Sequence, residues 1–520
     1  MNDGLLLAID AGTGSCRALL FDSKGNLVAS AQREYSHHAI PGVEGSQQFD
    51  IDANWKLICV CVREAMSRSG SPPDAVRAIT ATSMREGMVL YDARGRELWA
   101  CPNVDARAAR QVERLVSSGA AAEIYAHAGD WVAITAPARL LWIAENEPEM
   151  LASAEHVTML GDWIIYRLSG EFVTDPSLGS SSGMFELRDR SWSPYIIELC
   201  GLREAMFPQV VEPGQAIGGL TVAAAADIGL RPGTPVVVAG ADTQLGLVGI
   251  GLVAPGPFAI VGGTFWQHTM VVTEPLIDPE ARLRTLCHTV PNHWMIEGLG
   301  FYSGLTMRWF RDAFCESDKA VAARAGIDVY EYLEGLAAEV PAGANGVLGI
   351  FSNLMDAKRW VHASPAFMQF DISRPETSGK KECLRAIEES AAYVSRGHLE
   401  LIRELTATPI DEVVLAGGAA NGTLWPQIVA DVLGLPVRIP VVTESTSLGA
   451  AAYAALGVGM YRDIDEAVAG IVHFDRTVEP RSAEHDAYEQ LYEQWRAVYA
   501  RALELSEAGL IRPLWRAAGT

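Results

Sequence analysis

Short apolar runs that end in glycine and small polar residues recur along the chain. The first run, Leu5–Ile9, delivers Asp10 and is followed by Ala11–Ser15, which reads AGTGS, and by a second apolar run, Ala18–Phe21. Two apolar runs of strand length around a glycine-rich turn are typical of a β-hairpin. We predict such a hairpin, with a polar tip, near the start of the chain.

The same pattern occurs again near the middle of the chain. The apolar run Phe258–Val261 enters Gly262-Gly263-Thr264 and returns along Thr269–Val272. Two strand–glycine–threonine–strand hairpins, one in each half, indicate two related domains that face one nucleotide. Neither hairpin is a P-loop or a dinucleotide-binding turn, because no G-x-x-x-x-G-K-[ST] occurs and neither turn has the strand-to-helix G-x-G-x-x-G.

Hydrophobic periodicity predicts the remaining elements. Apolar residues three and four apart indicate amphipathic helices, and short continuous apolar runs indicate buried strands. Strands are expected at Leu27–Tyr35, Ala75–Thr82, Pro235–Ala239 and Val413–Ala416, and helices at Asp50–Arg68 (capped by Asp52), Ala106–Ser117, Pro137–Glu147, Gly298–Cys315, Lys380–Leu405, Thr446–Gly459 and Ala483–Glu507. The tract Gly179–Gly183 lacks lysine and is expected to be a loop. We expect Met307, Trp309, Phe310 and Phe314 in the core.

Length and charge limit the classes of function. A chain of 520 residues is too long for one core and suggests two domains, which we place at residues 1–249 and 250–520. The formal net charge of −23 argues against nucleic acid or an anionic membrane as a partner, because both bind basic surfaces. An anionic nucleotide must therefore be held by local groups.

The spacing of the cysteines and the hydropathy profile favour a cytoplasmic location. The eight cysteines are scattered without the spacing of a zinc site or a disulfide framework. The sequence has no basic, apolar leader at its start and no apolar run of 18 residues. We expect a cytoplasmic protein, and nothing in the sequence excludes a homodimer.

The tip of the first hairpin carries groups that bind phosphate. Gly14 lets backbone N–H groups approach a ligand closely, Thr13 and Ser15 add hydroxyl donors, and Arg17 adds a positive charge. Asp10, at the end of the first strand, is suited to hold a metal ion through water. A plain structural turn has similar glycines, so the prediction depends on the second copy of the hairpin. Its corresponding residues are Gly263 and Thr264.

A carboxylate follows the buried strand predicted at Pro235–Ala239. The chain reads GADTQ there, so Asp242 comes where a strand ends and a glycine-containing helix begins. Phosphoryl transfer to an alcohol needs a group that accepts the hydroxyl proton. Asp242 is the candidate for this base, and its alternative role is to cap the helix.

Polar residues also follow the strand predicted at Ala75–Thr82. Arg85 and Glu86 come directly after it, where ligands bind in α/β sheets. Arg can donate to a hydroxyl or carbonyl and Glu can accept from a hydroxyl, which suits a small polyol, although an arbitrary Arg-Glu pair is more often a surface ion pair. Asp105 follows in ACPNVDARAAR, either as the N-cap of the next helix or as a substrate ligand.

These segments resemble the FGGY family of carbohydrate kinases, which includes glycerol kinase and xylulokinase. The resemblance is carried by DAGTGSCR, GADTQLG, GGTFW and LAGGAANGTLWPQIVADVLGLPV, and it extends over roughly Leu5 to Tyr461. It implies an α/β fold of two actin-like (ribonuclease H-like) ATPase domains that flank a catalytic cleft. It also implies ATP and Mg²⁺ as cofactors and a small-molecule polyol or dihydroxy-dione as substrate.

The resemblance assigns roles to individual residues. Asp242 matches the catalytic base of the family, and Mg²⁺ is implied at Asp10 and Asp242 through water. Polyol contacts are implied at Arg85 and Glu86, which turns their interpretation from a surface ion pair to a substrate site. Further substrate contacts are implied at Asn103, Asp105, Thr243 and Trp266. Nucleotide contacts are implied at Thr13, Gly14, Ser15, Arg17, Gly263, Thr264, Gly418, Ala419 and Asn421.

Four segments narrow the expected substrate. SMREGMVLYD, ACPNVDARAAR, GGTFWQ and FYSGLTMRWFRDAFC are most similar to the subgroup that phosphorylates the quorum-sensing signal autoinducer-2. The expected acceptor is the 5-hydroxyl of (S)-4,5-dihydroxypentane-2,3-dione. The alternatives are a kinase for a pentulose or tetritol such as xylulose, ribulose or erythritol, and a filament protein or nucleotide-dependent chaperone of the same fold. The latter need no base aimed at a small hydroxyl, so Asp242 with Arg85 and Glu86 argues against them.

Overall fold

The N-terminal hairpin lies inside the first of two large β-sheets. In the computed structural model its apolar runs form β1 (Leu5–Ala11) and β2 (Ser15–Phe21), which pair antiparallel. On its other side β1 pairs in parallel with β4 (Val76–Ser83). The six strands of this sheet, in spatial order, are β12 (Ala216–Gly219), β13 (Pro235–Val238), β4, β1, β2 and β3 (Leu27–Glu34).

The second hairpin has the same place in the second sheet. β14 (Phe258–Gly262) pairs antiparallel with β15 (Trp266–Val272) and in parallel with β20 (Val413–Gly417), as β1 pairs with β2 and β4. The seven strands, in spatial order, are β16 (Arg284–Cys287), β17 (Trp294–Gly300), β15, β14, β20, β21 (Val437–Pro440) and β22 (Phe474–Val478). The prediction of two related hairpins is confirmed, because the pairing around each is the same.

Two helices cross between the sheets. α10 (Asp242–Gly249) packs against the second sheet and α16 (Ser445–Gly457) against the first, although each belongs to the other half of the chain. Gly249 and Gly449 make the crossing possible, since a Cβ at these positions would lie 1.9 Å and 2.0 Å from a carbonyl oxygen of the partner helix. Each half therefore contributes a helix to the core of the other.

The other elements cover the outer faces of the sheets or form insertions. α1 (Ile51–Ser69) packs on β2 and β3, and α14 (Lys380–Thr406) packs on β15 and β17. The remaining helices are α2 (Ala109–Ser118), α3 (Ala120–Ala128), α4 (Ala136–Asn146), α5 (Pro148–Ser153), α6 (Leu160–Ser169), α7 (Pro176–Ser181), α8 (Pro194–Leu199), α9 (Val222–Ile228), α11 (Ser303–Phe314), α12 (Glu316–Ala325), α13 (Val329–Ala338), α15 (Leu424–Leu433), α17 (Ile464–Ile471) and α18 (Ser482–Glu507). The smaller strands are β5 (Met88–Tyr91), β6 (Glu97–Cys101), β7 (His156–Met159), β8 (Val173–Thr174), β9 (Phe185–Glu186), β10 (Ser191–Trp192), β11 (Gln209–Val210), β18 (Leu348–Ile350) and β19 (Ala366–Met368).

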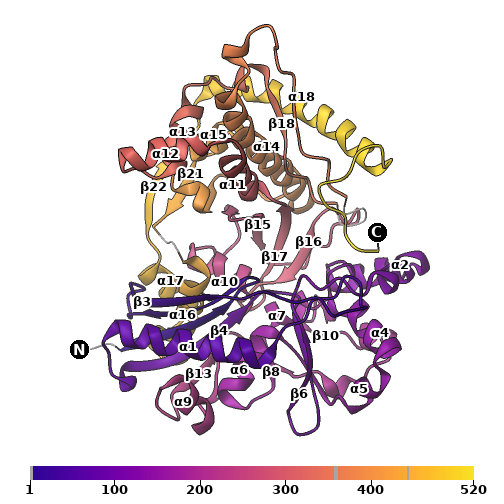
Figure 1. Ribbon diagram of the computed structural model, residues 1–520. Coiled ribbons are helices and arrows are strands. Elements are labelled where there is room, and N and C mark those ends of the chain that lie inside the picture. The colour runs from indigo at the N-terminus through magenta and orange to yellow at the C-terminus, as the bar shows by residue number, and fades with distance from the viewer. Residues whose placement is uncertain (1–3, 357–360, 442–443, 520) are drawn as a thin grey trace.

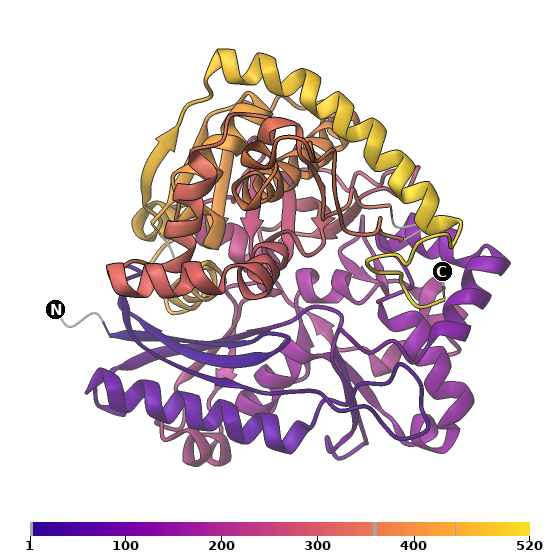
Figure 2. The ribbon, with the colours of Figure 1, turned by 45° about the horizontal axis from the view of Figure 1, so that its top comes forward.

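The two sheets and their helices form two lobes, one above the other in Figure 1. The structure describes residues 4–356, 361–441 and 444–519. α18 runs along the outer side of the upper lobe, and the chain after it descends to the lower lobe (Figures 1 and 2). The eight cysteines are all free and buried. Among the described helices, none combines the length and the apolar character that a membrane span requires.

Two local expectations at helix starts were wrong. Asp50, not Asp52, caps α1, because the Asp50 carboxylate accepts the N–H of Ala53 at 2.9 Å. The expected loop at Gly179–Gly183 is in its first part the end of α7, which Asp175 caps through two backbone N–H groups. The N-cap upstream of the tract starts the helix that includes its first residues. The composition of the tract alone gives no information about that cap.

The segment expected as one helix from Gly298 contains a strand end and a helix. β17 runs to Gly300 and α11 begins at Ser303. Met307 and Phe310 are buried as expected, whereas Trp309 and Phe314 are 43% and 57% exposed. Trp309 lies two positions from Met307, which puts it on a different side of the helix, and Phe314 is the last helical residue.

Candidate active site

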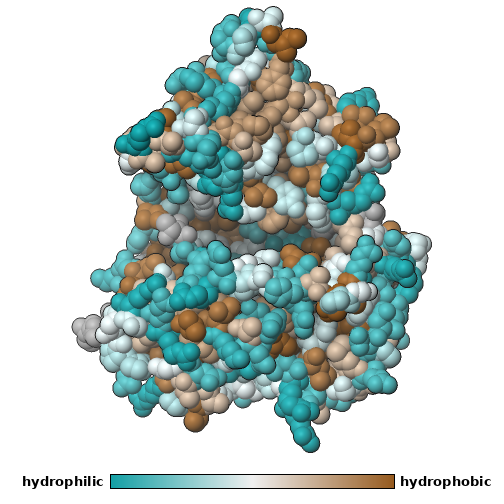
Figure 3. Space-filling view, viewed as in Figure 1, coloured by the Kyte–Doolittle hydropathy of each residue, from teal (hydrophilic) through white to brown (hydrophobic). Residues whose placement is uncertain are grey.

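The tips of both hairpins are open to solvent, and the molecule is hollowed between its two lobes. Figure 3 shows this hollow across the middle of the surface. Thr13 and Gly14 at the first tip are exposed, and so are Gly263 and Thr264 at the second. The hydroxyls and main-chain N–H groups that the sequence assigns to phosphate are therefore accessible to a ligand.

Asp242 lies at the junction between β13 and α10. The turn before it requires glycine, because Gly240 has a φ of 138° and a Cβ there would lie 2.5 Å from Thr289 Cγ2. Ala241 is the N-cap of α10, and Asp242 is the first helical residue. The Asp242 carboxylate accepts the N–H of Thr243 at 2.8 Å, and its side chain remains 31% exposed. The carboxylate is thus held in place and still open to a ligand.

The surroundings of Asp242 move its pKa towards neutrality. Burial raises the pKa of Asp242 to about 7, Arg85 lowers it from a distance of 3.8 Å between Nε and Oδ1, and the carboxylates of Asp10 and Glu86 raise it. A proton acceptor works best when its pKa lies near the pH at which it operates. The site therefore has the electrostatics of a general base.

Asp10 and Arg17 face each other across the first hairpin. They are partners in the β1–β2 register, and Arg17 Nη2 lies 2.6 Å from Asp10 Oδ2, while Nη1 lies 2.5 Å from Glu444 Oε2. Burial raises the pKa of Asp10, and the charge of Arg17 opposes this effect. Asp10 is thereby held at the end of β1, on the side of the sheet where Asp242 follows β13.

The carboxylates of Asp10 and Asp242 fit a hydrated divalent cation. The charge of Asp10 raises the pKa of Asp242, so the two groups lie close enough to repel each other. Carboxylate oxygens are ligands that Mg²⁺ prefers, and Mg²⁺ usually keeps several of its waters. Within residues 4–356, 361–441 and 444–519, no group of three or more His, Cys, Asp or Glu side chains is placed to hold a metal directly.

Arg85 and Glu86 lie at the carboxyl end of β4 in a buried ion network. Both are 6% exposed, so they are not a surface ion pair. Arg85 binds Glu297 through both terminal nitrogens, at 3.0 and 3.2 Å, which leaves its Nε facing Asp242. Glu86 accepts a hydrogen bond from Arg284 at 3.1 Å. The structure thus brings the predicted acceptor residues and the predicted base together.

Arg284 extends this network to a third carboxylate. Its Nε donates to Glu297 at 2.6 Å, its Nη2 to Glu86 and its Nη1 to Asp130 at 3.3 Å. Burial raises the pKa of Asp130 to about 6. Burial also opposes ionisation of Glu297, but Arg85 and Arg284 hold the pKa of that group below its usual value. Two arginines therefore share three buried carboxylates, which leaves the floor of the site negative beside Asp242.

The structure separates Asn103 from Asp105. Asn103 Nδ2 donates to Thr13 Oγ1 at 3.1 Å, so a predicted acceptor residue touches a predicted phosphate residue. The Asp105 side chain is fully buried, pairs with Arg107 at 2.8 Å and accepts the N–H of Gln47 at 2.7 Å. The expectation that Asp105 caps the next helix was wrong, because Ala108 is the N-cap of α2. The substrate role of Asp105 stays a prediction, and in this structure its carboxylate is paired and has no exposed surface.

Trp266, a residue implied to contact the substrate, lies in the core of the second lobe. Trp266 is fully buried and packs on Trp425, with 5.1 Å between ring centroids. Successive residues of a strand point to opposite faces, so the next residue, Gln267, points the other way. Gln267 Nε2 donates to Thr243 Oγ1 at 2.9 Å, directly beside Asp242. Gln267 is the residue of β15 that reaches the site.

This assignment predicts different effects for neighbouring substitutions. We expect Trp266→Phe to lower stability by about 1–3 kcal/mol, since it removes buried ring volume, and to leave the KM of the acceptor unchanged. The matched variant Gln267→Leu should raise that KM with little loss of stability. Urea unfolding and steady-state kinetics of both variants test this, and a selective effect of Trp266→Phe on acceptor KM would contradict it.

The segment after β20 forms a tight turn against the second hairpin. Gly417 has a φ of 92°, and a Cβ there would lie 2.4 Å from the carbonyl oxygen of Gly262. Gly418 and Asn421 are exposed, whereas Ala419 is buried. A planar ring can lie on this exposed main chain with Asn421 at its edge, and Ala419 can contribute only through its main chain.

Two charged side chains from other elements hold this turn. Glu334 on α13 accepts the backbone N–H groups of residues 423–425 at 2.9–3.1 Å. Arg476 on β22 donates to the carbonyl oxygens of Ala420 at 2.9 Å and Gly422 at 2.6 Å. Because Glu334 already occupies the N-terminus of α15, that helix end is closed to a phosphate.

Sequence reasoning missed several residues of this site. Arg284 and Glu297 are the single charged residues of β16 and β17 and are direct cross-strand partners. A charge inside an apolar strand was a usable signal for them. Glu334 and Arg476 had no local signal, because their partners are main-chain groups more than fifty residues away.

Comparisons with known proteins agree with this geometry. The model of the FGGY family of carbohydrate kinases, N-terminal domain, matches residues 5–249, and the model of the C-terminal domain matches residues 258–458. The chain belongs to the FGGY family of carbohydrate kinases. It is 45% identical to an autoinducer-2 kinase of Yersinia enterocolitica serotype O:8 over 517 residues, which are 99% of this chain and 98% of the relative. An autoinducer-2 kinase of Yersinia pestis bv. Antiqua is also 45% identical, over 99% of this chain and 97% of the relative.

Solved structures share the fold over almost the whole chain. Xylulose kinase from Rhodospirillum rubrum superposes with a TM-score of 0.83 at 26% identity and covers 96% of this chain and 98% of its own. Ligand-bound xylulose kinase from Lactobacillus acidophilus has a TM-score of 0.86 at 19% identity, over 98% of this chain and 100% of its own, which shows the fold alone. The predicted fold of two actin-like domains is confirmed.

Proposed function

We propose that the chain transfers the γ-phosphoryl group of ATP to the 5-hydroxyl of (S)-4,5-dihydroxypentane-2,3-dione, the precursor of autoinducer-2. One observation carries the chemical part of the proposal: the partly buried carboxylate of Asp242 at the start of α10, with its pKa raised to about 7, faces Arg85 at 3.8 Å. The identity of 45% to autoinducer-2 kinases over nearly the full length supports the choice of acceptor.

In this mechanism Asp242 accepts the proton of the acceptor hydroxyl as that oxygen attacks phosphorus in line. Arg85 orients a hydroxyl or carbonyl of the acceptor through its Nε, and Glu86 and Asn103 complete the acceptor side. The floor of three carboxylates and two arginines disfavours an anionic acceptor and suits a neutral, hydroxyl-bearing one.

The nucleotide lies on the other side of the base. Thr13 and Thr264 donate to its phosphates from the two hairpin tips, with the main chain of Gly14 and Gly263. The exposed turn at Gly418–Asn421 takes the adenine ring. Residues Asp10 and Asp242 would hold Mg²⁺ through water, which neutralises charge on the phosphates.

A pentulose kinase is the second candidate function. The observation that favours it is the superposition of xylulose kinase from Rhodospirillum rubrum at 26% identity over 96% of this chain. A few side chains at the acceptor site decide among small polyols, and both functions need the same base and the same nucleotide site.

The experiment that separates these functions measures ADP release by the purified protein with Mg²⁺ and ATP. The acceptors are the dione, D-xylulose, L-ribulose, glycerol and erythritol, and a reaction without acceptor gives the background. We expect kcat/KM for the dione to exceed every other value by at least about tenfold, a difference of about 1.4 kcal/mol in transition-state free energy. A higher kcat/KM for a pentulose or tetritol would show that the dione is not the acceptor but would leave the proposed phosphoryl transfer in place. If no acceptor increased ADP release, both the acceptor and the reaction proposed here would be wrong.

A further inference from the structure

Arg139 on α4 is a buried arginine that binds only main-chain oxygens. It is 2% exposed. Its Nε and Nη2 donate to the carbonyl oxygen of Asp105 at 3.2 and 3.0 Å, Nη2 also donates to that of Asn103 at 2.8 Å, and Nη1 donates to that of Glu86. Within the part of the chain that the structure describes, no carboxylate lies within ion-pair distance of its guanidinium. Burying a cation without a counter-ion costs free energy. The role of Arg139 therefore depends on the main-chain segments whose carbonyl oxygens it binds.

The three carbonyls belong to the two segments that carry acceptor residues. Glu86 lies in the turn between β4 and β5, and Asn103 and Asp105 lie after β6. Glu86 has a φ of 60°, a left-handed conformation that residues other than glycine adopt only under strain. The hydrogen bond from Arg139 to the Glu86 carbonyl holds the main chain in this conformation, and the Glu86 side chain is then in place to meet Arg284.

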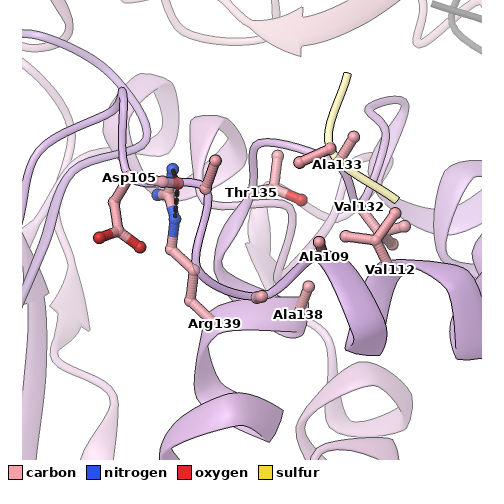
Figure 4. Close-up of a pocket in the computed structure, with 11 residues that line it drawn as sticks. Asp105, Ala109, Val112, Val132, Ala133, Thr135, Ala138 and Arg139 are labelled. Carbon is pink, nitrogen blue, oxygen red and sulfur yellow. Dashed lines mark hydrogen bonds between the residues drawn. The ribbon is translucent and has the colours of Figure 1, made fainter. Parts of the chain in front are cut away.

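The arrangement around Arg139 is visible in Figure 4. The side chain rises from α4 to the main chain of Asp105, whose carboxylate points away from the guanidinium. A small pocket lies beside the arginine stem, lined by Asp105, Thr135, Ala138 and, from the C-terminal tail, Ala518. Lysine and methionine are smaller than arginine, so either side chain can take its place without a clash.

We propose that Arg139 is a positioning residue for the acceptor site. It ties the Glu86 turn to the Asn103–Asp105 segment so that Glu86 and Asn103 hold the geometry that the acceptor needs, an inference that rests on the proposed kinase function. Arginine is required because three nitrogens in one plane reach three carbonyls at once, whereas the ammonium of lysine is a single point with a shorter reach.

The test compares Arg139→Lys and Arg139→Met with a control of equal burial. Arg385 on α14 is 3% exposed and binds Glu389 and Tyr488 in the other lobe, so Arg385→Lys controls for loss of a buried guanidinium. Arg139→Met keeps the stem and leaves no carboxylate without its partner. For each protein, the KM values of the acceptor and of ATP, acceptor-independent ATP hydrolysis and the midpoint of urea unfolding are measured.

We expect both Arg139 variants to raise the acceptor KM by about tenfold or more, which corresponds to about 1.4 kcal/mol, with the ATP KM and acceptor-independent hydrolysis unchanged. Arg385→Lys should lower the unfolding midpoint and leave both KM values unchanged. Equal increases in both KM values, or a loss of stability alone, would overturn the inference. The inference would also be overturned if both Arg139 variants failed to fold while Arg385→Lys folded. Arg139 would then stabilise the whole lobe and not the acceptor site in particular. The proposed function fails separately, if the wild-type protein transfers phosphate to no acceptor.

Discussion

Asp242→Asn should reduce kcat for acceptor phosphorylation by about 10²- to 10⁴-fold, the range that a positioned general base contributes. The amide keeps the shape of the carboxylate and can still accept the N–H of Thr243, but it cannot take the acceptor proton. Acceptor-dependent ADP release measures the loss, and titration with a fluorescent ATP analogue shows whether the nucleotide site is retained.

The same substitution should change stability in a way that depends on pH. Because the folded-state pKa of Asp242, about 7, lies above the usual aspartate value, the folded protein binds this proton more tightly than the unfolded chain does. Ionised Asp242 therefore weakens the wild-type fold increasingly as pH rises from 4 to about 7. We expect Asp242→Asn to gain stability relative to wild type over that interval when nucleotide and Mg²⁺ are absent.

Asp162→Asn is the matched control for this experiment. Asp162 is buried in α6 of the same lobe, where it accepts the N–H of Met159 at 3.0 Å. An amide oxygen can keep that hydrogen bond, so turnover should remain near the wild-type value. A comparable fall in kcat for both variants would show that Asp242 acts through the structure of the lobe and not as the base.

The parts of the site that were predictable from the sequence are those that depend on local pattern. The two hairpins could be predicted because apolar runs and glycine turns fix a hairpin within about twenty residues. Asp242 could be placed because a carboxylate at the end of a buried strand has few positions to occupy. The roles of these residues remain predictions, whereas their placement is a property of the fold.

The parts of the site that could not be predicted depend on strand register and on contacts between segments that are distant in the sequence. Trp266 and Gln267 differ by one position, and only the pairing of β15 decides which of them faces the site. Asp105 forms an ion pair with Arg107, two residues further along the chain. This local ion pair competes with the binding of a ligand by Asp105. The main-chain partners of Arg139 cannot be read from residue types, because every residue offers the same carbonyl.

Arg284→Met should cost about 3–5 kcal/mol of stability, the range found when one partner of a buried ion pair is removed. Arg284 is 1% exposed and binds three carboxylates, and its loss leaves Arg85 alone among Glu86, Asp130 and Glu297. We expect a lower urea midpoint together with a large fall in kcat/KM for the acceptor, since Glu86 and Arg85 lose the group that fixes them.

The pH dependence distinguishes unpaired charge from lost packing. Arg284 lowers the pKa of Asp130 and of Glu297, so its removal raises the pKa of both groups, and acidification then relieves the excess negative charge in the folded state and stabilises it. The stability difference from wild type should therefore be largest near pH 8 and shrink towards pH 5. Adding Asp130→Asn removes one of the excess negative charges and should restore part of the lost stability at pH 8. If the single variant is equally destabilised at both pH values and Asp130→Asn restores nothing, Arg284 stabilises the junction of the two lobes by packing, and the charge balance beneath Asp242 is not what holds Arg85 and Glu86 in place.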